Sequence, residues 1–398
     1  MVLEQKRGWK EAAWIFVLSR LIIILISYRS IVLLPIYRGG LRNYIVTSAC
    51  FTQNLTCFVE SWWRWDAIRY VEIAYYGYAY DRANTVFFPL FPLMMHYLAG
   101  FFGGSGFANY VAGLVLANVC FYVAMVLFYQ LLCQDFNQIV ARNALIYLAF
   151  APYAIFFFAG YAESLFLLLS LAVFIFLRRG GPKDWWLAAT CGFLAALTRP
   201  TGIVLIVPFL VLLVQRFGWR TFFTRENWLH KLNAFLSVAL IPLGVLVYML
   251  ALRIQFGNPF LFSVEQARVW SRYLDFPWLG IHYAFKALYI SGYYFQRNLA
   301  DLCFTLIPML VLILGWHRLP LHYNLYSLVM TLFVLCFPVL YIGKSLMSAP
   351  RHLMMIFPTF VIMGIYHEKS NLARVLLIIS ITFFAMNIML FVTQIWVA

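Results

Sequence analysis

A polar and aromatic segment, residues 61–92, interrupts an otherwise apolar sequence and contains the residue best suited to chemistry, Asp66. Three tryptophans and an arginine come before this carboxylate, and two motifs that end in proline, Phe87-Phe88-Pro89 and Phe91-Pro92, follow it. A carboxylate beside a substrate hydroxyl can accept its proton while the oxygen attacks a carbon that carries a good leaving group. Asp66 is therefore a candidate general base for group transfer.

The spacing of the residues around Asp66 indicates which of them share its surroundings. In a helix, Asp66, Arg69 and Tyr70 lie on one face, and Glu72 points away from it. Asp66 and Glu72 are therefore not expected to form a carboxylate pair. The same spacing also fits a plain surface helix in which Asp66 pairs with Arg69 or Arg64, so the spacing alone leaves both interpretations open.

The composition places these residues in a membrane protein. Of the 398 residues, 64% are hydrophobic and only 11% are charged, whereas soluble domains carry about 25% charged residues. Backbone polar groups inside a bilayer must be satisfied within helices or closed barrels. Apolar runs long enough for helical spans therefore predict an all-α polytopic membrane protein, with residues 1–398 forming a single integral domain.

One helical span needs about 20 apolar residues, and on this criterion the chain has roughly eleven spans. They are predicted at 12–36, 107–132, 141–158, 163–177, 185–198, 201–215, 232–253, 299–315, 323–342, 352–366 and 373–395. The apolar stretch 87–102 is short and contains Pro89 and Pro92. We expect a re-entrant or surface-lying helix there, on the outer side.

Lysines and arginines in the short loops set the predicted orientation. One group of loops is rich in them, and the positive-inside rule makes that face cytoplasmic. These residues are Lys6, Arg7, Lys10, Arg178, Arg179, Lys183, Arg216, Arg220, Arg225, Lys231, Arg318, Lys369 and Arg374. The N-terminus is then inside, and the long segments 37–106 and 256–298 lie outside. Loops of such length are usually functional, so we expect catalysis or binding at the outer face.

Further cations are predicted at or near the outer face, where they suit an anionic ligand. Arg199 lies between two predicted spans, and Arg351 directly follows a proline at the start of another. Positive charge in such places is expected where a lipid phosphate is held. The alternative is that these side chains snorkel to phospholipid headgroups or anchor the protein at the interface.

The second long segment contributes a polar and aromatic strip. Glu265, Arg268 and Arg272 have the spacing of one helical face beside Gln266 and Trp270. Such a strip suits either a sugar-binding surface or a network of ion pairs. We assign the charged residues to the network and Gln266 to the site.

Other reactive side chains give weaker indications. Glu163, between two short spans, either assists in the pocket or caps a helix. Cys50 and Cys57 flank an Asn-Leu-Thr sequon, and a disulfide between them is left open. The seven cysteines show no spacing typical of zinc or redox pairs. His96 and His282 have no companion at ligand spacing, so no metal site is predicted.

Several motifs, in order along most of the chain, resemble one family of membrane enzymes. They are Trp65-Asp66-Ala67, Ile73-Ala74, Gly77-Tyr78, Phe87-Phe88-Pro89-Leu90-Phe91-Pro92, Leu197-Thr198-Arg199-Pro200-Thr201-Gly202, Gln266 with Trp270, and Ser348-Ala349-Pro350-Arg351 before Phe357-Pro358. The family comprises the mannosyltransferases that add the second mannose to glycosylphosphatidylinositol, and their prokaryotic relatives. It belongs to the superfamily of polyprenyl-phosphate-sugar-dependent glycosyltransferases with the C-type membrane fold.

The resemblance implies an inverting transfer of mannose from a polyprenyl- or dolichyl-phosphate sugar to a hydroxyl of a lipid-linked or glycolipid acceptor. It makes Asp66 the general base, and it makes Arg199 and Arg351 the cations that meet the charge growing on the leaving phosphate. The residues that we predict to contact the substrate are Trp65, Arg69, Tyr70, Glu163, Gln266 and Trp270. The reaction is expected on the non-cytoplasmic face of the plasma or inner membrane of a prokaryote, or of the endoplasmic reticulum of a eukaryote.

The chain departs from the family pattern at two positions. Relatives commonly carry a histidine where this chain has Arg69, and often a tyrosine where it has His352. The chain has no glycine-rich phosphate loop and no paired-aspartate motif. This fits a lipid-phosphate donor, so we expect no metal and no other cofactor. The expected partners are the donor, the acceptor and membrane lipids, without nucleic acid.

Two other functions remain compatible with the sequence. A lipid-carrier flippase or exporter shares the hydropathy and the external cations, but it needs no carboxylate at position 66, and the chain shows no internal repeat of the transporter kind. A transferase of glucose or of a pentose keeps the same fold and the same site. Replacing Asp66 by asparagine tests the first alternative, and a comparison of donors tests the second.

Overall fold

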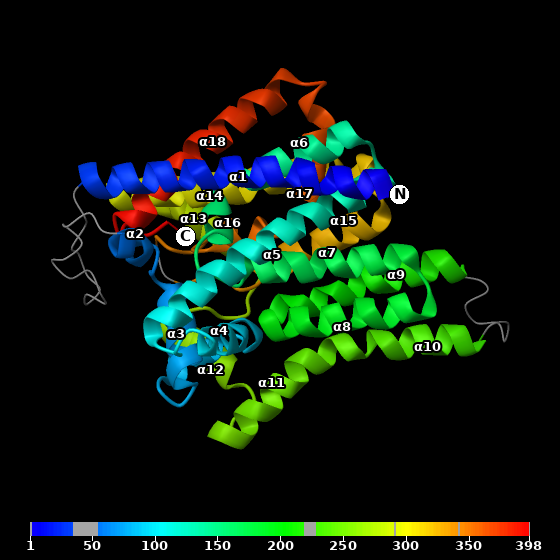
Figure 1. Cartoon of the computed structure of the whole chain (residues 1–398), viewed down its shortest axis with the longest axis horizontal. Coiled ribbons are helices and arrows are strands. Elements are labelled where there is room, and N and C mark those ends of the chain that lie inside the picture. Colours follow the sequence, from blue (N-terminus) through cyan, green and yellow to red (C-terminus); the bar gives the residue numbers. More distant parts are fainter. Residues whose placement is uncertain (1, 35–54, 219–227, 290–291, 341–342, 398) are drawn as a thin grey trace. The chain divides into compact units, whose positions relative to one another are not determined.

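The described part of the chain is almost entirely helical, as the composition predicts. The structure, a computed structural model, describes residues 2–34, 55–218, 228–289, 292–340 and 343–397 (Figure 1). Within these ranges no strand forms, apart from one isolated antiparallel bridge between Arg272 and Val339. The predicted pairing of Cys50 with Cys57 falls outside the described residues.

The chain divides into two compact units, and the first comprises residues 1–80, 91–164 and 363–398. Its elements are α1 (Val2–Leu33), α2 (Leu55–Ser61), α3 (Asp66–Tyr76), α4 (Leu90–Gly100), α5 (Gly106–Asp135), α6 (Gln138–Ala149), η3 (Ala154–Phe157) and α18 (Asn371–Val392). Helix α1 packs against α5, α6 and α18. The side chains of Ser105 and Asn137 accept hydrogen bonds from backbone N–H groups, which fixes where α5 and α6 begin.

The second unit comprises residues 81–90 and 165–362. Its elements are η2 (Arg82–Val86), α7 (Glu163–Arg179), α8 (Pro182–Thr198), η4 (Pro200–Leu205), α9 (Ile206–Phe217), α10 (Trp228–Val238), α11 (Leu240–Phe256), α12 (Leu261–Trp270), α13 (Leu279–Ala287), α14 (Tyr293–Leu314), η6 (Trp316–Arg318), α15 (Leu321–Leu335) and α16 (Ala349–Leu353). Helix α8 packs against α10, α11 and η4, all green in Figure 1. The boundary between the units falls near the start of α7 and within α17 (Pro358–His367).

Six helices among the described residues are long and apolar enough to span a membrane. They are Gly8–Leu33, Gly106–Asp135, Pro200–Phe217, Lys231–Phe256, Phe295–Leu314 and Asn371–Val392. Each of them coincides with a predicted span, which confirms the all-α polytopic class. The predicted number of eleven is not confirmed.

Shorter helices form at the other predicted spans, and prolines account for three of them. Helix α6 ends at Ala149, shortly before Pro152, and α15 ends at Leu335, shortly before Pro338. Helix α17 begins only at Pro358. Proline tends to follow helix ends or to occupy first turns, because it lacks a backbone N–H group. The stretch predicted to be re-entrant contains α4, which begins directly after Pro89.

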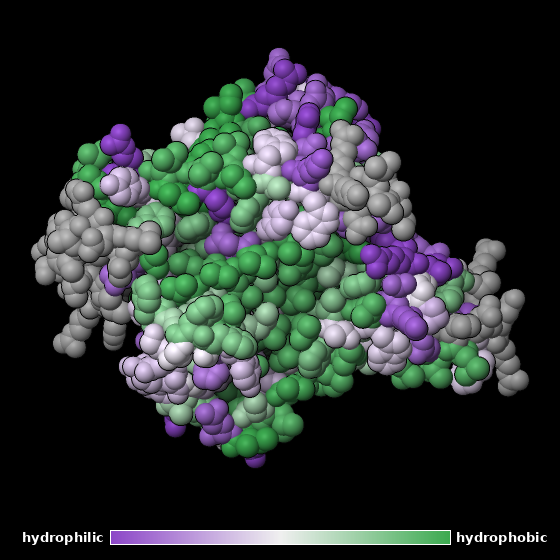
Figure 2. Space-filling model, in the orientation of Figure 1, coloured by the Kyte–Doolittle hydropathy of each residue, from purple (hydrophilic) through white to green (hydrophobic). Residues whose placement is uncertain are grey.

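Hydrophilic side chains gather at one end of the second unit. Figure 2 shows them where α7 ends and α8 begins, beyond the apolar surface of the helices. This turn carries Arg178, Arg179 and Lys183, and the guanidinium of Arg216 lies 5.9 Å from the ring of Trp185. These cations belong to the face that we predict to be cytoplasmic.

Candidate active site

Asp66 is the first residue of α3, and it is buried, with 9% of its surface exposed. Helix α3 begins after a sharp turn at Trp65, whose backbone has φ 46° and ψ −113°. A bulky side chain rarely adopts a positive φ, and such a conformation persists only where the surroundings over-determine it. The direction of the Asp66 carboxylate is therefore set by the structure around Trp65.

Aromatic contacts within the first unit hold this turn. The ring of Trp65 meets Phe391 and Trp396 edge-on, at centroid distances of 4.8 and 5.3 Å. Trp63 stacks on Tyr110 at 5.0 Å, with an angle of 8° between the rings. Aromatic pairs of this kind contribute about 0.5–1.5 kcal/mol each beyond the burial of their area. Side chains from α5 and from the end of the chain thus fix the three-tryptophan motif.

Two tyrosines also hold the backbone of this turn. The Tyr161 hydroxyl donates a hydrogen bond to the carbonyl of Arg64 at 3.1 Å. The Tyr110 hydroxyl donates to the carbonyl of Val59 at 2.9 Å. Both acceptors are main-chain carbonyls, so these two bonds hold the backbone of the turn that precedes Asp66.

Of the two residues predicted to share a face with Asp66, Tyr70 is buried with it and Arg69 is only half-buried. Tyr70 lies on this face, with 2% of its surface exposed, and its ring meets Phe91 edge-on at 5.1 Å. Arg69 lies at the edge of this face, and its Nη1 donates to Oε2 of Glu72 at 3.2 Å. The cation that the sequence places beside the candidate base therefore has a carboxylate partner in Glu72.

Glu163 is fully buried, and it is the first residue of α7. An acidic side chain at this position interacts favourably with the helix dipole. The structure thus places Glu163 where the capping interpretation expects it, and a role in the pocket stays a prediction.

Arg199 belongs to the second unit and lies between α8 and η4, with an extended backbone. Its carbonyl accepts a hydrogen bond from the N–H of Gly202 at 2.9 Å, and its Nη1 lies 3.5 Å from the sulfur of Met355. A Cβ atom at Gly202 would lie only 2.4 Å from the backbone nitrogen of Ala196. The glycine of this motif therefore lets η4 fold back closely on α8, which positions Arg199.

Arg351 lies in α16, with 6% of its surface exposed. The predicted span 352–366 is not one helix here, because α16 has five residues and α17 begins separately at Pro358. Ser348, which precedes α16, adopts a left-handed conformation with φ 63°. Helix α16 packs against α14 and α15. Arg351 is thus held by a short turn between packed helices, and not by the start of a long helix.

Arg199 and Arg351 share an electrostatic environment with Arg272 and His352, neither of which the sequence analysis assigned to the site. Burial, and then the guanidinium groups of Arg199, Arg351 and Arg272, lower the pKa of His352 well below its ordinary range. His352 is therefore a neutral imidazole among three cations. The sequence does carry one indication of His352: it stands where relatives often have a tyrosine.

The strip predicted on the second long segment is confirmed only in part. Gln266 and Trp270 lie on α12, and Glu265 forms an ion pair with Arg268 at 2.5 Å. Arg272 does not share this face, because α12 ends at Trp270 and Ser271 turns the chain with φ 52°. The predicted network on this helix is therefore reduced to the pair of Glu265 and Arg268. Trp270 also meets the ring of Phe87 edge-on at 5.9 Å.

The predicted site residues thus form two sets, each within its own unit. The first set contains Trp65, Asp66, Arg69, Tyr70 and Glu163, and the second contains Arg199, Gln266, Trp270 and Arg351. The carboxylates belong to the first set, two of the three arginines belong to the second, and both sets contain aromatic side chains. In the part of the chain that the structure describes, no group of three or more His, Cys, Asp or Glu side chains could hold a metal ion.

The apolar spanning helices define an integral membrane protein, in which a buried carboxylate and a cluster of arginines are the candidate site residues. The chain belongs to the mannosyltransferase (PIG-V) family, whose model matches residues 10–256. This range includes Asp66 and Arg199, and it ends before Arg351. The family expected from the motifs is therefore confirmed.

One curated relative, GPI mannosyltransferase 2 of Schizosaccharomyces pombe, is 30% identical over 158 residues. The match covers 37% of this chain and 31% of the length of the yeast protein. Two solved structures are among those that the chain resembles. The oligosaccharyltransferase of Archaeoglobus fulgidus has a TM-score of 0.49 at 13% identity, covering 96% of this chain and 52% of that chain. ArnT from Cupriavidus metallidurans, bound to undecaprenyl phosphate, has a TM-score of 0.48 at 13% identity, with coverages of 96% and 76%. Family membership rests on the sequence match.

Proposed function

We propose that this protein transfers mannose from a polyprenyl-phosphate-mannose donor to a hydroxyl of a lipid-linked acceptor, with Asp66 as the general base. The setting of Asp66 is the observation that carries the proposal. This carboxylate is buried, begins a helix, lies inside the range that matches the family, and follows a tryptophan held in an unfavourable backbone conformation. Such a costly arrangement is typical of functional sites.

Two charges must be accommodated in the proposed reaction. As the acceptor oxygen attacks the anomeric carbon of mannose, its proton passes to the Asp66 carboxylate. The bond between that carbon and the phosphate oxygen breaks, and both of its electrons go to the phosphate. The leaving group thus changes from a phosphodiester with one negative charge to a monoester with up to two. Arg199 and Arg351 are the cations that we propose to stabilise this charge.

Both sets of site residues contain aromatic side chains that could contact a sugar. Trp65 and Tyr70 accompany Asp66, and Gln266 and Trp270 lie together on α12. A sugar presents hydroxyl groups and apolar ring faces, which amide and aromatic side chains can match. We propose these four residues as substrate contacts. Arg69 is the predicted contact with the least support, because its guanidinium is already paired with Glu72.

The acceptor and the side of the membrane follow from weaker indications. The name of the yeast relative, GPI mannosyltransferase 2, supports a glycolipid acceptor. The cations at the turn between α7 and α8 support an active site on the opposite, non-cytoplasmic face. We propose a glycolipid acceptor at that face.

A donor comparison in proteoliposomes tests the proposed function. The purified protein is supplied with polyprenyl-phosphate-mannose, polyprenyl-phosphate-glucose or GDP-mannose, each together with a glycolipid acceptor, and the release of polyprenyl phosphate is measured. We expect turnover of the lipid-linked mannose alone, and we expect it to persist in excess chelator. Turnover of polyprenyl-phosphate-glucose instead would show that the transferred sugar is glucose. Turnover of none of the donors would favour a transport function.

A further inference from the structure

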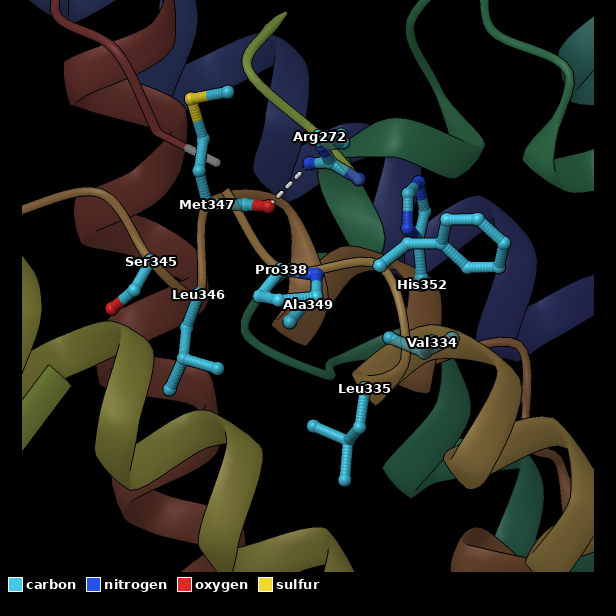
Figure 3. Close-up of a pocket in the computed structure, with 10 residues that line it drawn as sticks. Arg272, Val334, Leu335, Pro338, Ser345, Leu346, Met347, Ala349 and His352 are labelled. Carbon is cyan, nitrogen blue, oxygen red and sulfur yellow. Dashed lines mark hydrogen bonds between the residues drawn. The ribbon is translucent and has the colours of Figure 1, made fainter. Parts of the chain in front are cut away.

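A small cavity in the second unit is lined by three polar side chains, Arg272, Ser345 and His352 (Figure 3). Its volume is about 10 Å³, which is close to the space that one water-sized group requires. The rest of the lining is mostly apolar and comes from α15, from the segment that follows it and from α16. The cavity therefore suits one oxygen atom of a ligand and not a whole sugar.

Backbone contacts carry Arg272 into this cavity. Residue 272 forms the isolated bridge with Val339, and the N–H of Leu340 donates to the carbonyl of Ser271 at 2.9 Å. The Nη2 of Arg272 donates to the carbonyl of Met347 at 2.5 Å, as the dashed line in Figure 3 shows. The segment after α12 is thus fixed to the segment after α15, so the guanidinium stays beside the cavity.

The polar groups of the cavity favour a ligand with negative oxygens. The Oγ of Ser345 is buried, with 1% of the residue exposed, and it has no hydrogen-bond partner among the described residues. A neutral imidazole offers one N–H donor, and a guanidinium offers donors only. In Figure 3 the Ser345 hydroxyl points away from Arg272 and His352. The match to a phosphoryl oxygen therefore rests on the guanidinium and imidazole donors.

We propose that this cavity binds one phosphoryl oxygen of the polyprenyl phosphate that leaves the reaction, and that His352 takes up a proton when this phosphate binds. This inference rests on the proposed function for the origin of the phosphate. Burial is the larger reason that the imidazole stays neutral, and three guanidinium groups add to it. An arriving anion offsets the charge of the guanidinium groups and so favours protonation of His352. His352 then changes from a neutral donor to a cation.

The proton uptake balances the charge that the reaction creates. The donor phosphodiester carries one negative charge, and the leaving monoester carries up to two after the bond to mannose breaks. The acceptor proton goes to Asp66, and a separate proton from water binds to the imidazole of His352. The site thus gains one positive charge as its ligand gains one negative charge. Binding of the monoester is therefore coupled to pH.

The helices that pack against α16 carry other titratable groups, including His322 on α15. Helix α14, which packs against α16, carries Arg297 and Asp301, whose Nε and Oδ2 atoms lie 3.9 Å apart. These two charges oppose each other. The groups that act on His352 are Arg199, Arg272 and Arg351, and arginine side chains keep their charge throughout the physiological pH range. The difference between the wild type and a His352 variant therefore isolates the part of the titration that belongs to His352.

Proton uptake can be measured without any sugar. Farnesyl phosphate is titrated calorimetrically into the purified protein in two buffers of different ionisation enthalpy, which gives the number of protons bound with the ligand. The same measurement is made on His352→Gln. The protons exchanged by the ligand itself are common to both proteins, so the difference reports His352. We expect the wild type to take up about half a proton to one proton more.

The sign of the pH dependence follows from the same linkage. Protonated His352 favours the anion, so the affinity of the wild type for farnesyl phosphate should fall as pH rises from 6 to 8.5, by about tenfold more than that of His352→Gln. His352→Tyr keeps a hydrogen-bond donor that does not titrate in this range. It should retain most of the affinity and lose the extra proton uptake. His282→Gln, which changes a histidine on α13, serves as the matched control.

The outcomes separate this inference from the proposed function. Equal proton uptake by the wild type and by both His352 variants would overturn it, even if mannosyl transfer from the lipid donor is confirmed. A His352-dependent uptake supports it, even if the transferred sugar proves to be glucose. Inorganic phosphate is the second probe. If it binds as tightly as farnesyl phosphate with the same uptake, the site serves free phosphate and the assignment to a lipid phosphate is wrong.

Discussion

The two sets of site residues are built in different ways. In the first unit, one carboxylate follows a strained turn that side chains hold, with Trp65 packed against Phe391 and Trp396. In the second unit, several cations gather from separate segments, and main-chain contacts such as the bond from Arg272 to Met347 hold them. A general base must point at one proton, whereas the negative charge of a phosphate is spread over several oxygens and can be stabilised by cations from several directions. A substitution of the base in the first unit should therefore abolish most of the activity. Substitution of one cation in the second unit should lower the activity only in part.

Asp66→Asn should have the largest effect. It removes the proton acceptor and leaves the size of the side chain unchanged, so kcat should fall about 10³-fold, equivalent to about 4 kcal/mol. The affinity for farnesyl phosphate should stay unchanged, because the proposed phosphate ligands lie in the second unit. Steady-state kinetics and calorimetry measure the two quantities. Asp66→Asn with more than a tenth of the wild-type kcat would contradict the role of the base.

Arg351→Gln should have a smaller effect, with kcat/KM lower by about 10²-fold, or about 2.7 kcal/mol. The remaining guanidinium groups still face the leaving phosphate, so activity should not vanish. Arg351→Lys keeps a point charge and should lose less. Both variants should weaken farnesyl phosphate binding, unlike Asp66→Asn. If Arg351→Gln lowers kcat and leaves this affinity unchanged, the division of roles between the two sets is wrong.

The sequence was informative where function depends on residues close together along the chain. Asp66 with Tyr70, and Arg199 with Gly202, could be predicted as site residues from the sequence. Each pair lies within a few residues of the chain, and a charged side chain is uncommon in such an apolar sequence. Arg272 and His352 could not, because they meet only through a bridge between segments and through packing of α16. The hydropathy pattern also could not predict the number of spans, because Pro152, Pro338 and Pro358 limit the lengths of helices inside apolar runs.

Gly202→Ala should destabilise the second unit without changing any charged group. The added Cβ would meet the backbone of α8 at 2.4 Å, and backbone atoms cannot move aside as flexible side chains do. Overpacking of this kind costs about 2 kcal/mol. Thermal unfolding in detergent should show a lower midpoint. Gly100→Ala is the matched control, because a Cβ there meets nothing within 4 Å, and it should leave the midpoint unchanged or raise it slightly.

The ion pair of Arg69 with Glu72 should give the smallest effect. The pair is partly exposed, with 31% of the arginine side chain accessible, so screening by solvent limits its contribution to about 0.5 kcal/mol. If Arg69 acts only through this pair, Arg69→Gln and Glu72→Gln should lower the unfolding midpoint by the same small amount and change kcat/KM by less than about threefold. Donor kinetics of both variants provide the check.

A clear difference between these two variants would change the view of the first unit. If Arg69→Gln lowers kcat/KM by tenfold or more while Glu72→Gln does not, the guanidinium itself contacts the substrate. The unit around Asp66 would then supply a cation as well as a base, and the separation of acid–base chemistry from phosphate binding would no longer hold. Equal and small effects leave Asp66 as the charged group of this unit on which the reaction depends.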